Sequence, residues 1–220
     1  MLRMKRTVIF AHYDSDNYIH KYVIYYLTKL NKIANTIIFV SDSHLSKKEK
    51  KKISKHCSHL IVGSHGEYDF GSYKRGYEYC VMNGFLKNTD ELIFCNDSCF
   101  GPIPNDGFNG LFQNSDIKQY DFYGIFMNNY GLKKQYEEYF YIEDIPHIQS
   151  YFFVCKPAVF LSSWFIFFMK NITVQPNKSE IIIQYEQGLT ALLKEKKHTI
   201  GTYLFFEKTK INTKNWQEIL

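Results

Sequence analysis

The sequence predicts an α/β fold in which a mostly parallel sheet is flanked by helices. Short runs that are apolar on both faces, as in strands buried in parallel sheets, recur through the first hundred residues. The segments between these runs carry apolar residues at helical spacing. With 220 residues and a hydrophobic fraction of 45%, the chain is long enough to bury a large core as a single domain.

The first half of the chain alternates between strand and helix patterns. Buried strands are expected over residues 7–11 (TVIFA), 36–40 (TIIFV), 60–62 and 91–95 (ELIFC). Helices are expected over residues 17–33, over residues 46–57, where S-K-K-E forms a capping box, and around residues 73–85. This alternation indicates parallel strands joined by helices.

The second half has a different pattern. Strands are expected over residues 121–126, 150–155 and 199–206, and helices over residues 158–169 and 179–196. Residues 128–147 are expected to be irregular. The aromatic helix at residues 158–169 fits burial in the core, and contact with a membrane surface is the alternative. No linker separates the two halves, so we predict one domain, residues 1–220, with halves at 1–104 and 105–220.

Composition narrows the class of protein. The formal net charge is +5, and much of it comes from residues 47–55, a pattern typical of a solvated helix face. An anionic lipid, a phosphorylated substrate or a nucleic acid would also fit that charge. Five cysteines without a CxxC pair favour reduced thiols and a cytoplasmic protein. The longest apolar region, residues 151–169, is interrupted by Lys156 and Pro157, which leaves too little for a membrane span.

Polar residues follow the predicted strands where each strand ends. Such positions matter because ligands of parallel sheets bind beyond the carboxyl ends of the strands. The first strand is followed by His12 and Tyr13, the second by Asp42, and the fourth by Asn96, Asp97 and Ser98.

The segment ELIFCNDSCFGP, residues 91–102, carries the strongest chemical pattern. Asp97 directly follows a buried strand, and one carboxylate at such an end can present a divalent cation, Mn²⁺ or Mg²⁺, to a diphosphate. An Asx turn is the alternative role of Asp97.

The segment GEYDFGSYKRG, residues 66–76, precedes the third helix. Its glycines permit close backbone approach, and a helix start offers free N–H groups to a phosphate. Lys74 could add a positive charge for that phosphate. An ordinary loop with a helix cap is the alternative.

These two segments together carry a resemblance. YDFGSYKRG, a helix, and then LIFCNDSCFGP resemble the rhamnan synthesis protein F family of bacterial polysaccharide glycosyltransferases. The resemblance continues through HIQSYFFVCK and YEQGLT and spans most of residues 7–205. It implies a Rossmann-like GT-A domain whose first half binds a nucleotide sugar and whose second half binds the acceptor. Ser98 departs from the acidic pair that is usual in GT-A enzymes.

The resemblance also implies an activity. A sugar, rhamnose or another hexose, would pass with inversion from a UDP or dTDP donor to a glycan or lipid-linked acceptor. The product would be a precursor of a cell-surface polysaccharide or lipopolysaccharide, made in the cytoplasm with peripheral contact to the inner membrane surface.

Roles for individual residues follow from the resemblance and from spacing. Asp42 matches the position that reads the pyrimidine base. The other residues expected at the donor are His12, Tyr13, Tyr68, Asp69, Lys74, Asn96, Asp97 and Ser98. Glu186 lies on the apolar stripe of its helix at spacings of four, three and seven residues from Ile182, Leu189 and Leu193, which predicts an inward carboxylate and a general base. A structural ion pair is the alternative, and His147 is the second candidate base.

Two other functions compete with this prediction. A sugar nucleotidyltransferase is also an α/β protein, but it needs a glycine-rich basic loop after the first strand, where this chain has HYDSD. A basic protein that binds nucleic acid is the second alternative. No known nucleic-acid motif is present and the aromatic residues are dispersed, so nucleic acid is not an expected partner.

Overall fold

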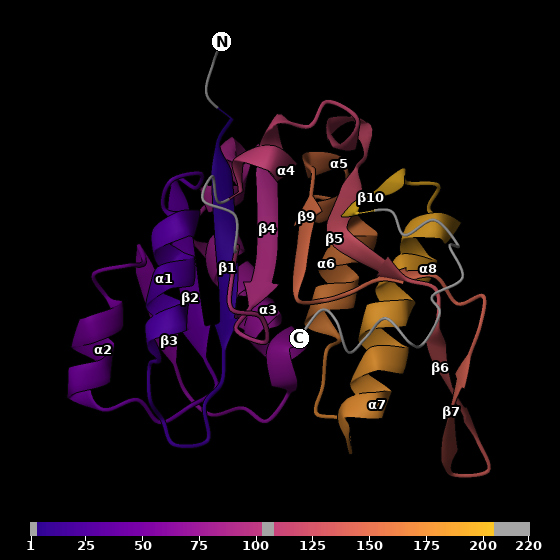
Figure 1. Ribbon diagram of the computed structural model, residues 1–220, viewed down its shortest axis with the longest axis horizontal. Helices are drawn as coiled ribbons and strands as arrows, with labels where there is room; N and C mark the ends of the chain where they lie inside the picture. The colour runs from indigo at the N-terminus through magenta and orange to yellow at the C-terminus, as the bar shows by residue number, and fades with distance from the viewer. Residues whose placement is uncertain (1–3, 103–107, 205–220) are drawn as a thin grey trace, which may run out of the picture.

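The computed structural model describes residues 4–102 and 108–204. Its centre is an eight-stranded sheet in the order β10-β5-β9-β4-β1-β2-β3, with β8 paired to β5. Helices lie on both sides of this sheet (Figure 1). The main strands are β1 (Arg6–His12), β2 (Thr36–Ser41), β3 (His59–Val62), β4 (Glu91–Asn96), β5 (Phe122–Asn128), β8 (His147–Ile148), β9 (Phe152–Cys155) and β10 (Ile200–Leu204).

The longer helices connect and cover these strands. They are α1 (Lys21–Leu30), α2 (Lys47–Ile53), α3 (Tyr68–Met82), α6 (Ser163–Lys170) and α8 (Gly188–Glu195). Shorter helical segments are η1 (Phe85–Asn88), α4 (Asn109–Gln113), η2 (Ile117–Gln119), α5 (Pro157–Phe160), α7 (Lys178–Ile181) and the π-helical segment η3 (Ile182–Gln187).

The first half of the chain builds the parallel part of the sheet. Strand β1 pairs in parallel with β2 and β4, and β2 pairs in parallel with β3. The register places Ala11 opposite both Val40 and Asn96, so these strands end at one level. From the second half, β9 lies antiparallel between β4 and β5, and β10 pairs in parallel with β5. The predicted mostly parallel sheet is confirmed.

Alternate side chains of β1 enter two hydrophobic cores. Ile9 packs with Phe70 on the face covered by α3 and α6. Phe10 packs with Tyr26 on the face covered by α1. Since both faces are covered, β1 is apolar from Val8 to Ala11, as the buried-strand pattern predicted.

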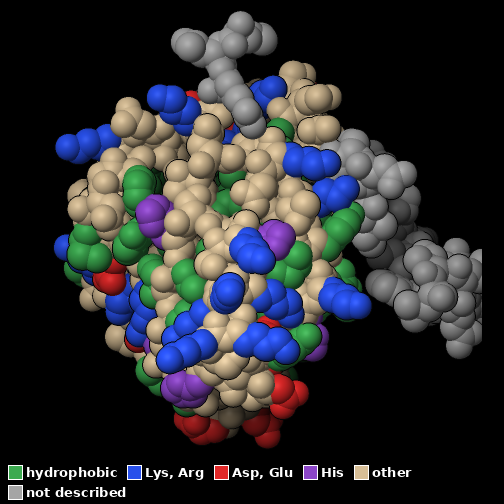
Figure 2. Space-filling view, turned by 90° about the vertical axis from the view of Figure 1, so that its left-hand side faces the viewer, with side chains coloured by type: hydrophobic (Ala, Val, Ile, Leu, Met, Phe, Trp, Pro, Cys, Tyr) green, Lys and Arg blue, Asp and Glu red, His purple; other side chains and the backbone are tan. Residues whose placement is uncertain are grey.

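The lysine-rich segment forms α2 and an exposed basic face. Ser46 caps the helix by accepting a hydrogen bond from the backbone N–H of Glu49, as the S-K-K-E pattern predicted. The Glu49 carboxylate turns inward and accepts from the backbone N–H of Ile19. No carboxylate of α2 therefore faces outward. Figure 2 shows Lys and Arg side chains gathered on this side of the molecule.

Helix α3 begins earlier than the sequence predicted. The segment assigned to a loop is helical from Tyr68 onward, so two of its glycines lie inside the helix. Gly76 faces β1, and a Cβ there would lie 2.4 Å from Cγ2 of Ile9. Gly76 therefore serves close helix–sheet packing and does not approach a phosphate.

Three predictions for the second half need correction. Residues 128–147 contain a hairpin, β6 (Gly131–Gln135) and β7 (Glu138–Ile142), whose two turn residues, Tyr136 and Glu137, both have positive φ. The predicted helix 158–169 is two helices, because Ser162 starts a new one by capping the N–H of Phe165. The predicted helix 179–196 contains the π-helical segment η3.

The exposure of the side chains of α6 bears on the two roles expected of the aromatic helix, which are burial in the core and contact with a membrane surface. Phe165 and Met169 are buried in the core, whereas Phe167 is 70% exposed. Within residues 4–102 and 108–204, no helix has the length and apolar character needed to cross a membrane.

Candidate functional site

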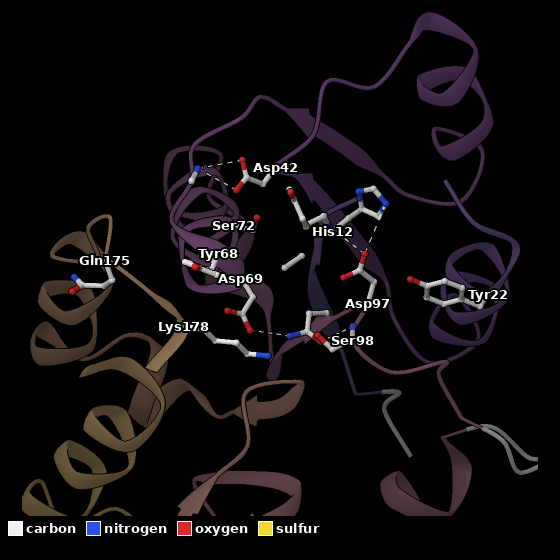
Figure 3. Close-up of a pocket in the computed structure, with 14 residues that line it drawn as sticks. His12, Tyr22, Asp42, Tyr68, Asp69, Ser72, Asp97, Ser98, Gln175 and Lys178 are labelled. Carbon is white, nitrogen blue, oxygen red and sulfur yellow. Dashed lines mark hydrogen bonds and ion pairs between the residues drawn. The ribbon is translucent and has the colours of Figure 1, made fainter. Parts of the chain in front are cut away.

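The carboxyl ends of β1, β2 and β4 and the start of α3 surround a cavity of about 640 Å³ (Figure 3). Because these three strands are parallel and end at one level, residues far apart in the sequence meet there. The structure brings to this cavity eight of the nine residues predicted to contact the donor: His12, Tyr13, Asp42, Tyr68, Asp69, Asn96, Asp97 and Ser98.

Asp97, which is largely buried, and His12, which is buried, form a polar pair on the cavity wall. Oδ2 of Asp97 accepts a hydrogen bond from the backbone N–H of Tyr13 at 3.1 Å and lies 3.8 Å from Nε2 of His12. Burial raises the pKa of Asp97 to about 7 and lowers the pKa of His12 to about 4. Among the described residues, Nε2 of His12 is buried and has no hydrogen-bond partner.

Asp42 holds the loop that follows β3. Its carboxylate accepts hydrogen bonds from the backbone N–H groups of His65 and Gly66. These bonds fix Gly66, which has a positive φ of 67° and itself lines the cavity. Asp42 thus has a structural role at the position where the sequence predicts recognition of the base, and base recognition stays a prediction.

Asp69 is the second residue of α3 and lies at the inner wall of the cavity (Figure 3). Its Oδ2 accepts hydrogen bonds from Nδ2 of Asn96 at 2.9 Å and from Oγ of Ser150 at 3.1 Å. Burial raises the pKa of Asp69 above its ordinary value, although these hydrogen bonds act in the opposite direction. Asp69 is therefore a positioned carboxylate with an enhanced affinity for a proton.

Glu186 lies behind that wall, on the other side of Ser150. Its Oε2 accepts a hydrogen bond from the backbone N–H of Ser150 at 2.9 Å, and its Oε1 lies 3.1 Å from Nε2 of His147. Nδ1 of His147 lies 2.8 Å from the carbonyl oxygen of Ile145. Both ring nitrogens face acceptors, an arrangement that favours the imidazolium form paired with Glu186.

The pKa shifts of this pair agree with an ion pair. Burial alone would raise the pKa of Glu186, but hydrogen bonds from His147 and Ser150 outweigh burial and lower it. Burial alone would lower the pKa of His147, but its bonds to Glu186 and Ile145 raise it. Neither Glu186 nor His147 lines the cavity. The geometry therefore favours a positioning role over the direct base role that the sequence predicts for each.

Lys74 is the one predicted donor-site residue that the structure places elsewhere. It lies within α3, and its Nζ donates to the carbonyl oxygen of Ile172 at 2.8 Å. The neighbouring Arg75 is paired with Glu67. The prediction of Lys74 in the donor site assumed a loop at this segment, and the helix turns the side chain away from the cavity.

The cavity also contains residues that the sequence analysis missed. Tyr22 comes from α1, Ser72 from α3, and Gln175 and Lys178 from the segment that leads into α7. No local motif marks these positions, because only the tertiary fold brings the start of α7 opposite the strand ends. The helix N-cap at Asn177 was the one available signal there, and it identifies a helix start only.

The fit of a divalent cation depends on Asp97. Among the described residues, no cluster of three His, Cys, Asp or Glu side chains could hold a metal ion. Magnesium is commonly held by one or two carboxylates together with phosphate oxygens of the substrate, so Asp97 fits a cation that arrives with a diphosphate.

Solved structures share the fold. A 4-diphosphocytidyl-2C-methyl-D-erythritol synthase superimposes with a TM-score of 0.54 at 7% identity and covers 99% of each chain. The corresponding synthase of Anaerococcus prevotii gives 0.51 at 8% identity over 99% of this chain and 93% of its own. The bifunctional IspDF of Campylobacter jejuni gives 0.51 at 12% identity over 98% of this chain and 54% of its own. At such identities the likeness concerns the fold alone, and it confirms the predicted α/β class.

Sequence comparisons identify the family. The uncharacterized protein y4gN of Sinorhizobium fredii is 25% identical over 154 residues, which are 70% of this chain and 37% of that protein. This chain therefore matches well under half of the length of its curated relative. The family described as rhamnan synthesis protein F matches residues 37–217, in agreement with the resemblance seen in the sequence. The chain belongs to the rhamnan synthesis protein F family.

Proposed function

We propose that this chain is a glycosyltransferase domain that uses a nucleoside diphosphate sugar. The observation that carries the proposal is the convergence of three parallel strand ends and the first turn of α3 on one cavity. Such a donor requires a pocket for its base, a site for its diphosphate and a proton acceptor near its sugar. Asp42, Asp97 and Asp69 lie on this cavity and supply side chains for these three tasks.

The family supports a proposal for the donor and the acceptor. We assign UDP or dTDP as the nucleotide and rhamnose or another hexose as the sugar. The acceptor is a glycan or lipid-linked precursor of a cell-surface polysaccharide or lipopolysaccharide. The reaction takes place in the cytoplasm, and the exposed lysines of α2 (Figure 2) supply contact with the anionic inner surface of the membrane.

Asp69 is the residue best placed to act as the base. In an inverting transfer, the acceptor oxygen forms a bond to the anomeric carbon while the bond from that carbon to the diphosphate breaks. The electron pair of the broken bond moves to the diphosphate oxygen, and the proton of the acceptor hydroxyl passes to Asp69. A raised carboxylate pKa suits this role, because a base works best near the operating pH.

Glu186 and His147 support Asp69 from behind. The backbone N–H of Ser150 donates a hydrogen bond to Glu186, which fixes the position of Ser150. The hydroxyl of Ser150 in turn donates a hydrogen bond to Asp69. The ion pair between Glu186 and His147 fixes that carboxylate. This chain of contacts links η3 to the cavity, and π-helical turns are frequent at functional sites.

Asp97 would hold a divalent cation, Mn²⁺ or Mg²⁺, where one takes part. Such a cation supplies positive charge that neutralises the departing diphosphate. With or without a cation, the pair of His12 and Asp97 gives the cavity a hydrogen-bonding group. The protonation of this group changes with pH, so it can act as a donor or as an acceptor.

A sugar nucleotidyltransferase is the second candidate, because solved proteins of this fold include 4-diphosphocytidyl-2C-methyl-D-erythritol synthases. Such an enzyme binds a nucleoside triphosphate and therefore needs several cations around the phosphates. Lys178 is the only Lys or Arg among the residues that line the cavity as the structure describes it. Release of pyrophosphate from a nucleoside triphosphate and a sugar 1-phosphate would support this candidate against the glycosyltransferase.

A thermal-shift screen tests the proposed function. The panel contains UDP-, dTDP-, GDP- and CDP-sugars, each with Mn²⁺ or with EDTA, and a single-stranded RNA. We expect a UDP- or dTDP-sugar to raise the melting temperature, because a ligand that binds only the folded state stabilises it by mass action. Stabilisation by RNA alone, with none by any nucleotide sugar, would contradict the proposal.

A further inference from the structure

The cavity has an unfavourable charge balance for the proposed donor. Three carboxyl groups line it, those of Asp42, Asp69 and Asp97, whereas a nucleoside diphosphate is an anion. Carboxylates repel phosphate oxygens unless positive charge or hydrogen-bond donors intervene. The site therefore needs at least one cation in contact with the diphosphate.

Lys74, which the sequence offered for this purpose, and its neighbour Arg75 are engaged elsewhere. Nζ of Lys74 donates to the carbonyl oxygen of Ile172. Arg75 is paired with Glu67 and also donates to the carbonyl oxygen of Gly71. Neither side chain lines the cavity.

Lys178 has the required position. It is the first residue of α7, lines the cavity, and extends into it in the direction of Asp69 and Ser98 (Figure 3). In the described parts of the chain, residues 4–102 and 108–204, its Nζ takes part in no hydrogen bond or ion pair. Its positive charge is therefore available to a ligand.

The backbone that carries Lys178 is anchored on both sides of the preceding turn. Nδ2 of Asn177 donates to the hydroxyl of Tyr139 at 3.0 Å. Nε2 of Gln175, another lining residue, donates to the hydroxyl of Tyr185 at 2.8 Å. These bonds hold the segment against β7 and η3, so Lys178 enters the cavity from a fixed position opposite the strand ends.

We propose that Lys178 binds the diphosphate of the donor and neutralises the charge that develops on it as the sugar leaves. The proposal rests on the proposed function and adds a residue from the second half of the chain to the donor site. Under this proposal, residues at the end of β4 and at the start of α7 together form the diphosphate site. A lysine acts here as a single mobile positive charge, so arginine at the same position should substitute for it.

The test compares ligands with and without phosphate. Isothermal titration calorimetry in EDTA measures the binding of UDP, dTDP, uridine and thymidine to the wild type and to the variants Lys178→Ala, Lys178→Arg and Lys170→Ala. Lys170 is an exposed lysine at the end of α6 outside the cavity lining and serves as the matched control. Circular dichroism verifies that each variant is folded.

We expect Lys178→Ala to weaken binding of the better diphosphate about tenfold or more, the typical effect of losing a charged hydrogen bond. Nucleoside affinity should not change, and Lys178→Arg and Lys170→Ala should bind UDP and dTDP within about threefold of the wild type. Equal diphosphate affinity of Lys178→Ala and the wild type would overturn this inference and leave the proposed function intact. Absence of UDP and dTDP binding by the folded wild type, both in EDTA and with Mn²⁺ present, would overturn both.

Discussion

Nε2 of His12 lies 3.8 Å from Oδ2 of Asp97 at the end of the parallel strands, where His12 is buried and Asp97 is largely buried. Burial lowers the pKa of His12 to about 4 and raises that of Asp97 to about 7. Between these values the histidine is neutral and the carboxyl is protonated, so the pair carries no net charge. Above pH 7 the cavity contains the Asp97 carboxylate in a largely buried position, and a cationic or hydrogen-bonding ligand would relieve this unfavourable state.

Replacing Asp97 by asparagine should stabilise the protein at alkaline pH. A carboxyl whose folded pKa lies above its unfolded value of 3.8 binds more protons in the folded state, so stability falls as pH rises from about 4 to about 7. Asp97→Asn removes this loss, and the gain at pH 8 should be on the order of a few kcal/mol. Urea unfolding at pH 4, 6 and 8 measures it. A gain that did not grow with pH would contradict the raised pKa.

Asp69→Asn and Glu186→Gln should have different kinetic effects. If Asp69 is the base, its amide variant should lose roughly 10²–10⁴-fold in kcat and keep its affinity for the donor. Glu186→Gln should lose less, because it removes only the support of Ser150. Steady-state kinetics across pH distinguishes the two roles.

The pH profile provides the decisive readout for this pair. Glu186→Gln should keep the ionisation of the base in its profile of kcat/KM, whereas Asp69→Asn should lose it. The reverse result would restore Glu186 as the base, which is the role predicted from its spacing in the sequence.

The ion pair between His147 and Glu186 should stabilise the fold most strongly between about pH 4.5 and 6.5, which are the ordinary pKa values of glutamate and histidine. A histidine with a raised folded pKa loses its contribution as pH rises through that value, and a glutamate with a lowered pKa loses its own as pH falls. The stability difference between the wild type and His147→Gln should therefore shrink from pH 6 to pH 8.5. Chemical denaturation at these two pH values measures it, and a constant difference would rule out a charged pair.

Gly76→Ala should destabilise the fold by about 1–3 kcal/mol through overpacking against Ile9. The added Cβ would lie 2.4 Å from Cγ2 of Ile9, which is closer than van der Waals contact allows. Gly188→Ala is the matched control, because its Cβ would lie 3.6 Å from the nearest atom, the carbonyl oxygen of Ile183. Thermal unfolding compares the two variants. Equal stability of both would show that α3 moves away from β1 without cost.

The fold could be predicted because its strands are locally distinctive. The run that became β1 is apolar from Val8 to Ala11, as burial on both faces requires, and β2 and β4 have similar apolar runs. The β6–β7 hairpin escaped prediction because its turn consists of Tyr136 and Glu137, without the Asn or Gly that favours positive φ.

Residues of the site could be predicted only where their place directly after a strand shows where they lie in the fold. Asp42 and Asp97 follow strands directly, so a parallel sheet places both at one edge. Lys178 was not predictable, since its approach depends on how α7 packs across the sheet. Lys74 was wrongly placed because a helix periodicity that continues through Gly71 and Gly76 is difficult to recognise in the sequence.

Calorimetric titration with UDP- and dTDP-sugars tests the central claim that the cavity binds a nucleotide sugar. The wild type should bind one of these donors with one site per chain. Ser98→Trp should abolish binding without unfolding the protein, because Ser98 is an exposed residue on the cavity lining and a large ring there fills the space. Donor binding by Ser98→Trp with wild-type affinity, or no binding by the wild type, would contradict the account.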